Sequence, residues 1–345
     1  MATTPVRRPS MADVALRAGV SHQTVSRVIN SPHTVREDTR GRVEQAISEL
    51  SYRPNVAART LVTQRSNRIG VIYGGAGFHG PQSALLAIEE AAREQGYFAN
   101  TAFIDGSDPS GAEQLLGYFL EQSVEGIIIV VPQLAVAAHI AALHTPVPVV
   151  FMAAWDADGI NDQQVLHVSI DQRLGARLAV NHLLSLGHTT VTHVAGVQEQ
   201  FDGKERVIGW REALAAQNAP PGQLVEGSWL ADDGYLAGLQ LAPSIKSGTG
   251  PTAIFAANDQ LALGLVHAFW EKGISVPDDV SLVGFDDESV ARHVTPPLTT
   301  LRQPFENLGR TAVGRLLAAI RGERAEQVRI EPTLIRRTST APPTR

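Results

Sequence analysis

The sequence predicts an α/β protein in two parts: a small N-terminal module of helices, followed by a larger body built on parallel β-sheets. Three observations lead to this fold class. The first 68 residues carry a net charge opposite to that of the rest, two helix starts follow each other closely near the N-terminus, and after residue 68 short apolar runs alternate with helical stretches. Such alternation is typical of doubly wound parallel sheets with right-handed crossovers.

The composition indicates a folded protein without disulfides or thiolate metal sites. Of 345 residues, 43% are hydrophobic and 19% are charged, which allows a large core. The absence of cysteine excludes disulfides, iron–sulfur clusters and cysteine nucleophiles. The longest apolar run, GIIIVV at 126–131, is too short to span a bilayer, and no apolar signal segment opens the chain. We therefore expect a soluble, cytoplasmic protein with no membrane partner.

The net charge of −6 hides a difference between the two parts of the chain. Residues 1–68 contain eleven arginines, no lysine and five acidic residues, a formal charge of +6, which leaves −12 for the remainder. A basic module on an acidic body points to a polyanion as the partner of the basic end. A solvated arginine-rich tail would account for the charge equally well.

The basic module is predicted to contain three helices. Ser10 and Asp13 match a capping box, and Gly19 suits the left-handed residue that ends a helix. Ser21 can cap a second helix two residues later, and a third is expected from about Glu37 to Leu50. Two short helices joined by a tight turn and followed by a third are the helix-turn-helix plan. The residues expected to face the core are Met11, Val14, Ala15, Ala18, Val20, Val25, Val28, Ile29, Val43, Ala46, Ile47 and Leu50.

A polar stripe on the second helix suggests contact with DNA bases. Glutamine can pair with adenine and arginine with guanine through two hydrogen bonds each in the major groove. An ordinary solvated helix face would show the same residue types, but the positive charge and the paired helices favour DNA. The candidate contacts on this helix and its cap are Ser21, His22, Gln23, Thr24, Ser26, Arg27 and Asn30.

The acidic body is predicted to form two lobes, because about 280 residues exceed what one compact lobe needs. Candidate strands are the apolar runs at 69–73, 98–104, 126–131, 147–152, 191–196, 252–257 and 280–285, with a further strand at 333–337. Candidate helices lie at 81–95, 109–122, 172–186, 203–217, 233–246, 259–272 and 305–321. Pro81 is expected at the first position of its helix, and Asp108 and Pro109 at the start of the next.

A glycine-rich loop raises the alternative of a nicotinamide-dependent enzyme. Gly75, Gly77 and Gly80 form G-x-G-x-x-G between a predicted strand and a helix, and Asp105 follows the next strand. Pro81 removes an amide from the helix end that would bind the pyrophosphate, and the glycines alone would allow a tight turn. We therefore expect no cofactor.

Other catalytic and metal-binding patterns are missing from the sequence. There is no G-x-S-x-G, P-loop, H-E-x-x-H or EF-hand loop. His188 and His193 are five residues apart near a strand, which directs them to opposite faces and favours structural roles. We expect neither a metal site nor an enzyme.

Specific motifs resemble those of the lactose repressor (LacI/GalR) family of bacterial transcription regulators. The DNA-end motifs are DVA..AGVS, TVSRVIN and Y.PN.AAR.L, within residues 11–61. The resemblance continues at LGH (186–188), ERVIGW (205–210), PTAIFAANDQLALG (251–264), VSLVGFDD (280–287) and PPLTTLRQPF (296–305). It covers nearly the whole chain.

The resemblance implies a hinge helix at about 54–62 that orders on operator DNA and lies in the minor groove. Leu61 would be the apolar wedge at the central base step, and Ala57 and Ala58 would let two hinge helices approach closely. Asn55 and Arg59 are further candidate DNA contacts in this segment. Arg36 departs from the family, where a serine-type cap before the third helix is common.

The resemblance also implies the fold of periplasmic sugar-binding proteins for the body, with an effector in the cleft between lobes. The expected domains are the DNA-binding domain at 1–66, one lobe at 67–170 and 302–330, and the other at 171–301 and 331–345. The chain would cross between lobes near Ile170, Leu301 and Ile330.

The family's effector positions correspond to polar and aromatic residues that suit a sugar. Planar polar groups can bind adjacent hydroxyls, and an aromatic ring can cover the C–H face of a sugar. Each residue also has a structural alternative: Arg206 and Asp286 as an ion pair, Trp229 as core, Asn258 as a helix cap, and Gln303 bonding only to backbone. The candidate effector residues are Phe78, His79, Pro81, Arg206, Trp229, Asn258, Asp286, Gln303 and Phe305.

This residue set is closest to the galactoside and glycoside responders of the family, so we expect a β-galactoside or related glycoside as effector. Ala153 is a departure, because the lactose-responsive pattern has an aspartate there; a longer oligosaccharide is an alternative effector.

We expect a homodimer that binds an operator with two-fold symmetry. Pro332, Pro342 and Pro343 near the end of the sequence leave no heptad pattern for a coiled-coil tetramer. A sugar-binding transport component is the other class considered; it would need an export signal and no DNA-binding module.

Overall fold

The computed structural model describes residues 9–53, 65–75, 77–104, 110–153, 166–324 and 326–344. The chain divides into two compact units, Met1–Ser66 and Asn67–Arg345, which are described separately below. Among the described residues, no helix is both long enough and apolar enough to cross a membrane.

The first unit contains the three predicted helices, α1 (Met11–Ala18), α2 (His22–Asn30) and α3 (Glu37–Glu49), with a short 3₁₀ turn η1 (Pro32–Thr34). The capping box is confirmed, because the Asp13 amide donates to Ser10 Oγ and the Ser10 amide donates to Asp13 Oδ2 at 2.7 Å. Gly19 ends α1 at φ +64°, a conformation that glycine adopts without strain. Arg36 precedes α3 without a side-chain cap, as its departure from the family pattern indicates.

The apolar faces of the three helices meet in one small core, which fixes the direction in which α2 presents its polar face. Val14, Val25 and Val43 are fully buried at its centre, one from each helix. Tyr52, just after α3, closes the core.

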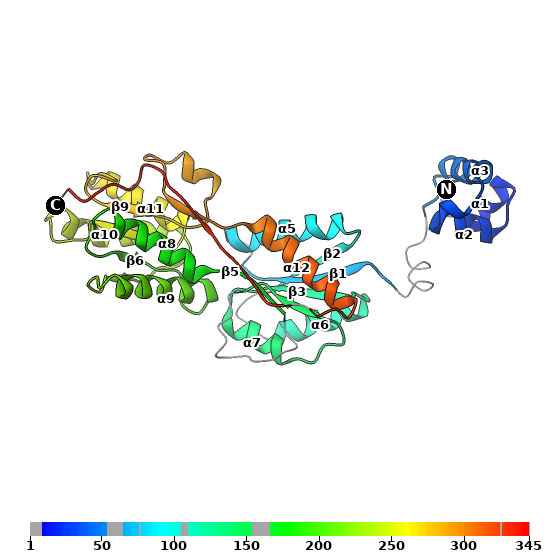
Figure 1. Cartoon of the computed structure of the whole chain (residues 1–345), viewed down its shortest axis with the longest axis horizontal. Helices are drawn as coiled ribbons and strands as arrows, with labels where there is room; N and C mark the ends of the chain where they lie inside the picture. The colour runs from blue at the N-terminus through cyan, green and yellow to red at the C-terminus, as the bar shows by residue number, and fades with distance from the viewer. Residues whose placement is uncertain are drawn as a thin grey trace, which may run out of the picture. The chain divides into compact units, whose positions relative to one another are not determined.

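The second unit contains a six-stranded parallel sheet in the order β11-β5-β4-β3-β1-β2. Its strands are β1 (Arg68–Tyr73), β2 (Phe98–Phe103), β3 (Gly126–Val130), β4 (Val149–Phe151), β5 (Leu166–Ile170) and β11 (Val328–Ile330). Helices α5 (His79–Glu94) and α12 (Phe305–Ile320) cover one face, and α6 (Ser110–Glu121) and α7 (Leu134–Ala142) cover the other (Figure 1). Successive β3 residues alternate between these faces, as in any buried strand.

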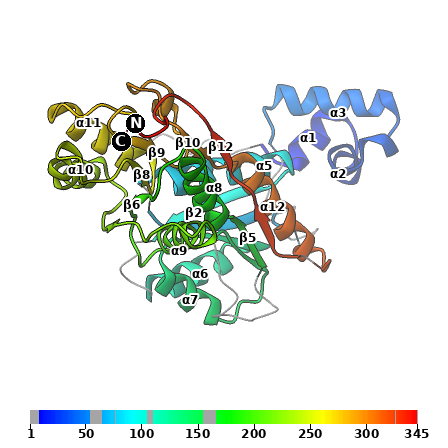
Figure 2. The ribbon, with the colours of Figure 1, turned by 60° about the vertical axis from the view of Figure 1, so that its left-hand side comes forward.

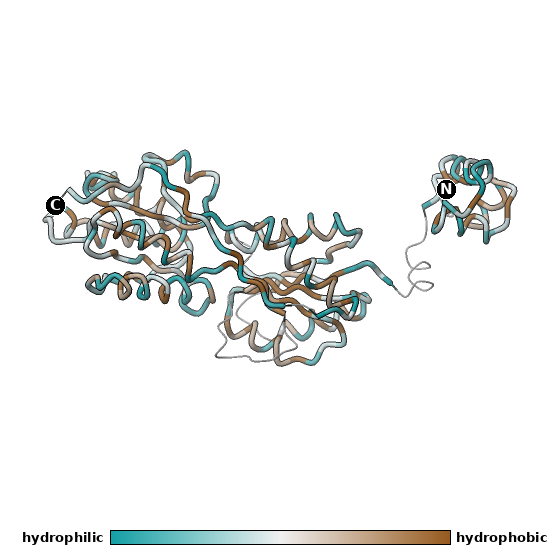
Figure 3. Tube along the Cα trace, in the orientation of Figure 1, coloured by the Kyte–Doolittle hydropathy of each residue, from teal (hydrophilic) through white to brown (hydrophobic). Residues whose placement is uncertain are grey.

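A second parallel sheet, in the order β7-β6-β8-β9, forms the other lobe. Its strands are β6 (Thr192–Val194), β7 (Leu224–Val225), β8 (Ala253–Ala256) and β9 (Ser281–Val283). Helices α8 (Gln172–Ser185) and α9 (Phe201–Ala216) pack on one face, and α10 (Ala231–Lys246) and α11 (Asp259–Glu271) on the other (Figure 2). The apolar stretches concentrate on the strands between these helices (Figure 3).

Three connections join the lobes, and they lie beside one another. The chain leaves the six-stranded sheet after β5, returns from β10 (Thr300–Arg302) into α12, and leaves again from β11 to β12 (Thr333–Ile335). Strands β10 and β12 pair antiparallel, and the Asp171 amide donates to the Ile330 carbonyl at 2.9 Å. A short 3₁₀ turn, η2 (Ser289–Arg292), precedes β10.

The parallel sheets are confirmed, and several element boundaries differ from the prediction. Helix α5 begins at His79, so Pro81 is its third residue; a proline is tolerated there because amides of the first turn have no partner within the helix. The strands β5, β7, β10 and β11 and helix α7 were not predicted, and most of these strands have only two or three residues. The expected caps Asp108 and Pro109 lie outside the described residues.

Candidate functional site

The polar stripe of α2 is exposed and partly held by local hydrogen bonds. Ser21 caps the helix by accepting from the Thr24 amide at 3.2 Å, and Asn30 Nδ2 donates to the Ser26 carbonyl at 3.0 Å. His22, Gln23 and Arg27 are exposed on the same helix. Their donors and acceptors can meet base edges if α2 enters a major groove. The hinge candidates Asn55, Ala57, Ala58, Arg59 and Leu61 lie outside the described residues.

A cavity of about 360 Å³ lies between the two lobes, at the low end of the usual ~300–1,000 Å³ for small-molecule sites. The loop and first turn at 77–82, together with Pro132 after β3, form the wall from the six-stranded lobe. Eight of the nine predicted effector residues line the cavity: Phe78, His79, Pro81, Arg206, Trp229, Asn258, Asp286 and Gln303. Phe305 does not; it lines a smaller neighbouring cavity, and its ring meets His79 edge to face at 5.6 Å between centroids.

Arg206, on α9, is the buried cation of the cavity, with 2% of its surface exposed. Its Nε donates to Gln172 Oε1 at 2.9 Å and its Nη1 donates to the Ala257 carbonyl. The guanidinium lies 3.8 Å from the Phe285 ring centroid. Burial lowers the pKa of Arg206, and Asp286 opposes this shift.

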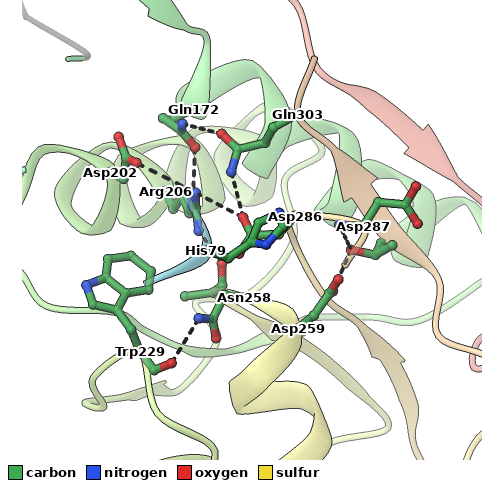
Figure 4. Close-up of polar contacts among 12 residues, drawn as sticks. His79, Gln172, Asp202, Arg206, Trp229, Asn258, Asp259, Asp286, Asp287 and Gln303 are labelled. Carbon is green, nitrogen blue, oxygen red and sulfur yellow. Dashed lines mark hydrogen bonds and ion pairs between the residues drawn. The ribbon is translucent and has the colours of Figure 1, made fainter. Parts of the chain in front are cut away.

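Asp286 and Gln303 join Arg206 in a chain of side chains at the point where the lobes connect (Figure 4). Gln303 Nε2 donates to Asp286 Oδ1 at 2.6 Å, Gln172 Nε2 donates to Gln303 Oε1 at 2.9 Å, and Arg206 Nη2 lies 3.8 Å from Asp286 Oδ1. The alternative in which Gln303 bonds only to backbone is therefore wrong. Burial raises the pKa of Asp286 to about 6, although Arg206 and His79 oppose this.

Asp286 also has a strained backbone, at φ +113°. A non-glycine residue in this region costs on the order of 1–3 kcal/mol and tends to occur at functional sites. Its amide donates to the Leu301 carbonyl at 2.7 Å, and the next residue, Asp287, is held by Arg302 and Arg337. The surrounding contacts thus fix the Asp286 carboxylate at the cavity.

Asn258 and Trp229 each serve the fold and the cavity together. Asn258 Oδ1 caps α11 by accepting from the Leu261 amide at 2.9 Å, and its Nδ2 donates to the Trp229 carbonyl at 3.0 Å. Trp229 Nε1 donates to Gln200 Oε1 at 2.7 Å. The indole packs over Gly196, where a Cβ would overlap the ring. The cap and core roles proposed as alternatives are therefore compatible with lining the cavity.

Several polar residues of this site were not predicted from the sequence. Gln200, Asp202, Gln260 and Glu288 line the cavity, and Gln172 and Asp259 are hydrogen-bonded to residues that line it. Asp259 is fully buried and accepts from Thr300 Oγ1 at 2.6 Å and from the Glu288 amide at 2.8 Å; burial raises its pKa well above the usual range. The one available signal was Asp202, which stands four residues before Arg206 on the same helix.

The glycine-rich loop makes a tight turn into α5. Gly75 has φ +68°, and the Phe78 amide donates to the Gly75 carbonyl at 2.9 Å. Asp105, the acidic residue of the nucleotide alternative, lies outside the described residues.

The ring nitrogens of His188 and His193, the two histidines considered in the sequence, form hydrogen bonds with other residues of the protein. His188 contacts Thr252 Oγ1 at 2.9 Å and the Ala341 carbonyl at 3.0 Å through its two ring nitrogens. His193 Nδ1 donates to the Phe255 carbonyl at 2.8 Å, and its ring stacks on the Phe255 ring.

Both units match known protein families. Residues 10–55 match the description "Bacterial regulatory proteins, lacI family", and residues 180–340 match a periplasmic binding protein-like domain. The lactose operon repressor of Escherichia coli (strain K12) is 36% identical, over 97% of this chain and 91% of that repressor. The HTH-type transcriptional regulator CelR of Thermobifida fusca is 35% identical, over 94% of this chain and 95% of CelR.

Solved structures show the same similarity. The lac repressor dimer bound to operator and the anti-inducer ONPF matches with a TM-score of 0.85 and 34% identity, over 97% of this chain and 100% of that chain. The complex of the transcriptional regulator CelR with cellobiose matches with a TM-score of 0.70 and 31% identity, over 96% of this chain and 100% of that chain.

Proposed function

The chain belongs to the lacI family of bacterial regulatory proteins, and from that premise we propose that it is a repressor whose operator affinity is switched by a small sugar. Membership makes it a DNA-binding regulator of transcription rather than an enzyme. In this proposal residues 1–66 bind DNA, and the two effector lobes comprise 67–170 with 302–330 and 171–301 with 331–345.

We propose a β-galactoside or related glycoside as the effector. The observation that carries this is the cavity, in which Arg206, Asp286 and Asn258 stand beside the Trp229 ring. Such groups can bind hydroxyls on the edge of a sugar while the indole covers a C–H face. The similarity to CelR, whose solved complex contains cellobiose, and to lac repressor supports a glycoside effector.

A thermal-shift screen tests this proposal. We expect lactose or cellobiose to raise the melting temperature, because a ligand that binds only the folded state stabilises it. Ribose and a purine base serve as comparison ligands, and the sugar that binds should also change operator affinity in a gel-shift assay. Stabilisation by the purine alone, or by none of these compounds, would contradict the glycoside proposal.

The DNA half of the proposal is tested at Gln23. Replacing Gln23 by alanine should weaken binding to the cognate operator by about 1–3 kcal/mol and relax preference at one base pair. Equal loss on operator and on random DNA would instead show that Gln23 contacts only the phosphates.

A second variant tests the proposed hinge segment. Leu61→Ala should lose operator affinity and keep sugar binding, because a minor-groove wedge and the cavity are separate sites.

We also propose a homodimer, since one helix-turn-helix reads one half-site. Light scattering at micromolar concentration should give about twice the chain mass of 36.9 kDa. A stable tetramer mass would contradict this assembly.

A further inference from the structure

Besides the three covalent connections, two loops join the lobes through a contact that we call the clasp, formed by residues 132–134 and 199–201. The Leu134 amide donates to the Glu199 carbonyl at 3.2 Å, and the Phe201 amide donates to the Pro132 carbonyl at 3.1 Å. Gln133 and Gln200 thereby pair as a single antiparallel bridge outside both sheets. The first loop follows β3 of the six-stranded lobe and the second precedes α9 of the other lobe, so the clasp spans the cleft.

The clasp also contains an apolar contact, because Phe201 buries its side chain in the lobe opposite to its own helix. Phe201 is the first residue of α9, yet it is 5% exposed and belongs to the core that α6 and α7 cover. The loop before α9 packs closely on that helix, since a Cβ on Gly203 would overlap the Val197 carbonyl. A displacement of α9, which carries Arg206, would therefore displace this half of the clasp.

A small cavity of about 60 Å³ lies between the clasp and the connections that join the lobes. Pro132 and Phe201 line it from the clasp, and Ile170 and Gln303 line it from the connecting segments. Side chains that face a void lack packing partners on that side. The clasp can therefore open while the covalent connections keep their own contacts.

The closed clasp leaves one polar group unsatisfied. Gln133 Oε1 is buried and has no hydrogen-bond partner among the residues that the structure describes. A buried acceptor without a partner is costly, and its hydration in an opened clasp would recover that cost. Two backbone hydrogen bonds and one buried ring favour closure, whereas this oxygen favours opening, which brings the two states closer in free energy.

Gln200 connects the clasp to the cavity proposed for the effector. Its Oε1 accepts from Trp229 Nε1 at 2.7 Å, and both residues line the cavity together with Pro132. A ligand that packs on the indole would restrain Trp229 and, through this hydrogen bond, the Gln200 half of the clasp.

We propose that the clasp is a conformational latch, which the effector favours in its closed state and which sets the relative position of the lobes and thereby operator affinity. The inference rests on the proposed function and adds to it the element that responds to the ligand. A ligand shifts a two-state element only if it binds the two states with different affinity. The hydrogen bond between Gln200 and Trp229 provides that difference.

A disulfide across the bridge tests the latch, because the sequence contains no cysteine that could compete for the new pair. Opposite residues of an antiparallel pair that lack mutual hydrogen bonds have Cα atoms ~4.5 Å apart, within the ~4.4–6.8 Å of disulfides. The oxidised Gln133→Cys/Gln200→Cys chain without sugar should bind the operator as sugar-saturated wild type does. Added sugar, which typically changes a coupled affinity by about 5- to 150-fold, should then change it by less than about twofold.

The reduced form of the same variant is the control for the loss of both amides. Dithiothreitol should return the operator affinity of the sugar-free variant to that of sugar-free wild type. An operator affinity that oxidation leaves unchanged, or failure of the disulfide to form under oxidising conditions, would overturn the latch.

A matched pair of substitutions separates the latch from ordinary core packing. Phe201→Leu and Phe119→Leu each remove part of a ring from the same core, but Phe119 lies on α6, in the lobe that contains this core. Both should lower the melting temperature, and only Phe201→Leu should reduce the sugar-induced change in operator affinity, by about threefold or more. An equal reduction in both variants would assign the effect to lost stability and contradict the latch.

Hydrogen exchange distinguishes failure of this inference from failure of the proposed function. In the sugar-free chain, peptides 131–135 and 198–202 should exchange at one common rate, faster than β3, because opening exposes the Leu134 and Phe201 amides together. Unrelated rates, or exchange as slow as that of β3, would overturn the latch even if a sugar switches operator binding. If no sugar switches it, while these peptides exchange together and oxidation of the double variant changes operator affinity, the glycoside proposal is wrong and the latch stands.

Discussion

The two walls of the cleft differ in chemistry. The wall from the four-stranded lobe carries Asp202, Arg206, Asp286 and Glu288, and Arg206 and Asp286 are tied into one hydrogen-bonded network. The wall from the six-stranded lobe consists of Pro132 and of the loop and first turn at 77–82, where glycine and proline stand beside Phe78, His79 and Gln82. The wall from the four-stranded lobe, the charged wall, can hold a polar ligand in place. The wall from the six-stranded lobe, the covering wall, can cover that ligand.

The difference indicates how an effector would act on the lobes. Burying Arg206 and Asp286 is costly unless each charge keeps its partners, so the network must be assembled before a ligand arrives. Phe78, from the covering wall, packs against the apolar core of the opposite lobe. A ligand held by the charged wall would therefore favour the arrangement in which the cover is closed, and only such differential affinity can shift a conformational equilibrium.

The largest effect is expected at the centre of the charged wall. Arg206→Met should reduce sugar affinity by at least a hundredfold, because it removes a donor and leaves Asp286 buried without its cation. Breaking such a pair costs on the order of 3–5 kcal/mol, which thermal unfolding will report. Asp286→Ala should also abolish the sugar response while operator binding is retained. Arg211→Met, at an exposed arginine of the same helix, is the control; a wild-type sugar response in Arg206→Met would show that the site is misplaced.

A smaller loss of sugar affinity is expected when the pH is lowered, because Asp286 on the charged wall becomes protonated. Burial raises the pKa of Asp286 to about 6, and Arg206, His79, Asp202, Asp259 and Glu288 surround it. Protonation removes a charged acceptor, so sugar affinity should fall severalfold between pH 7.5 and pH 5, measured by titration at each pH. Asp286→Asn should flatten the dependence centred near pH 6. An equally steep profile in that variant would assign the titration to another group.

Protonation of Asp286, which should weaken sugar binding, should stabilise the folded protein. The pKa of Asp286 is higher in the folded protein than the ordinary value of 3.8, so the folded state binds this proton more tightly. The resulting stabilisation is complete below pH 3.8 and is lost as pH rises through about 6. Unfolding curves of wild type and Asp286→Asn at pH 5 and pH 7.5 measure this contribution separately from sugar binding.

A modest effect is expected at the covering wall. Phe78→Ala should weaken sugar binding by about three- to tenfold, since it removes apolar contact worth ~25 cal/mol per Å² and not a charged partner. The loss should be accompanied by a smaller sugar-induced change in operator affinity, because the closing contact is gone. A loss as large as that of Arg206→Met would remove the distinction between the walls.

The smallest effect is expected at the rim. Gln82 is exposed on the covering wall, and Gln82→Ala should change sugar affinity by less than twofold. Calorimetry under the conditions used for Phe78→Ala checks this. A larger loss would show that the covering wall also binds the effector through polar contacts.

Elements defined by local interactions could be predicted from the sequence. The Ser10–Asp13 capping box, Gly19 and Ser21 act over three or four residues, so the starts of α1 and α2 and the exposed face of α2 follow from spacing alone. The long buried strands were also predictable, because an apolar run such as 126–131 has no other stable environment. Short strands such as β7 and β10 could not be predicted, since two or three residues carry no period.

The candidate site was predictable only in part. The resemblance of motifs supplied Arg206, Trp229, Asn258, Asp286 and Gln303, which the structure brings to one cavity. It did not supply Gln172, whose partners lie 34 and 131 residues away, nor Asp202, whose carboxylate lies 3.9 Å from the Arg206 guanidinium. Their roles depend on how the segments that join the lobes meet.

The sequence by itself determined the helix-turn-helix unit, the parallel α/β body and the family, because these depend on capping, periodicity and contiguous motifs. Only the tertiary structure decided which groups around the cleft remain available to a ligand. Hydrogen bonds between distant segments occupy these groups one pair at a time. Gln303 is bonded through both its amide nitrogen and its amide oxygen, whereas among the described residues Asp202 has an ion pair with Arg206 and accepts no hydrogen bond. The sequence defines the type of each side chain, but the neighbours of that side chain in space determine which of its donors and acceptors remain unused.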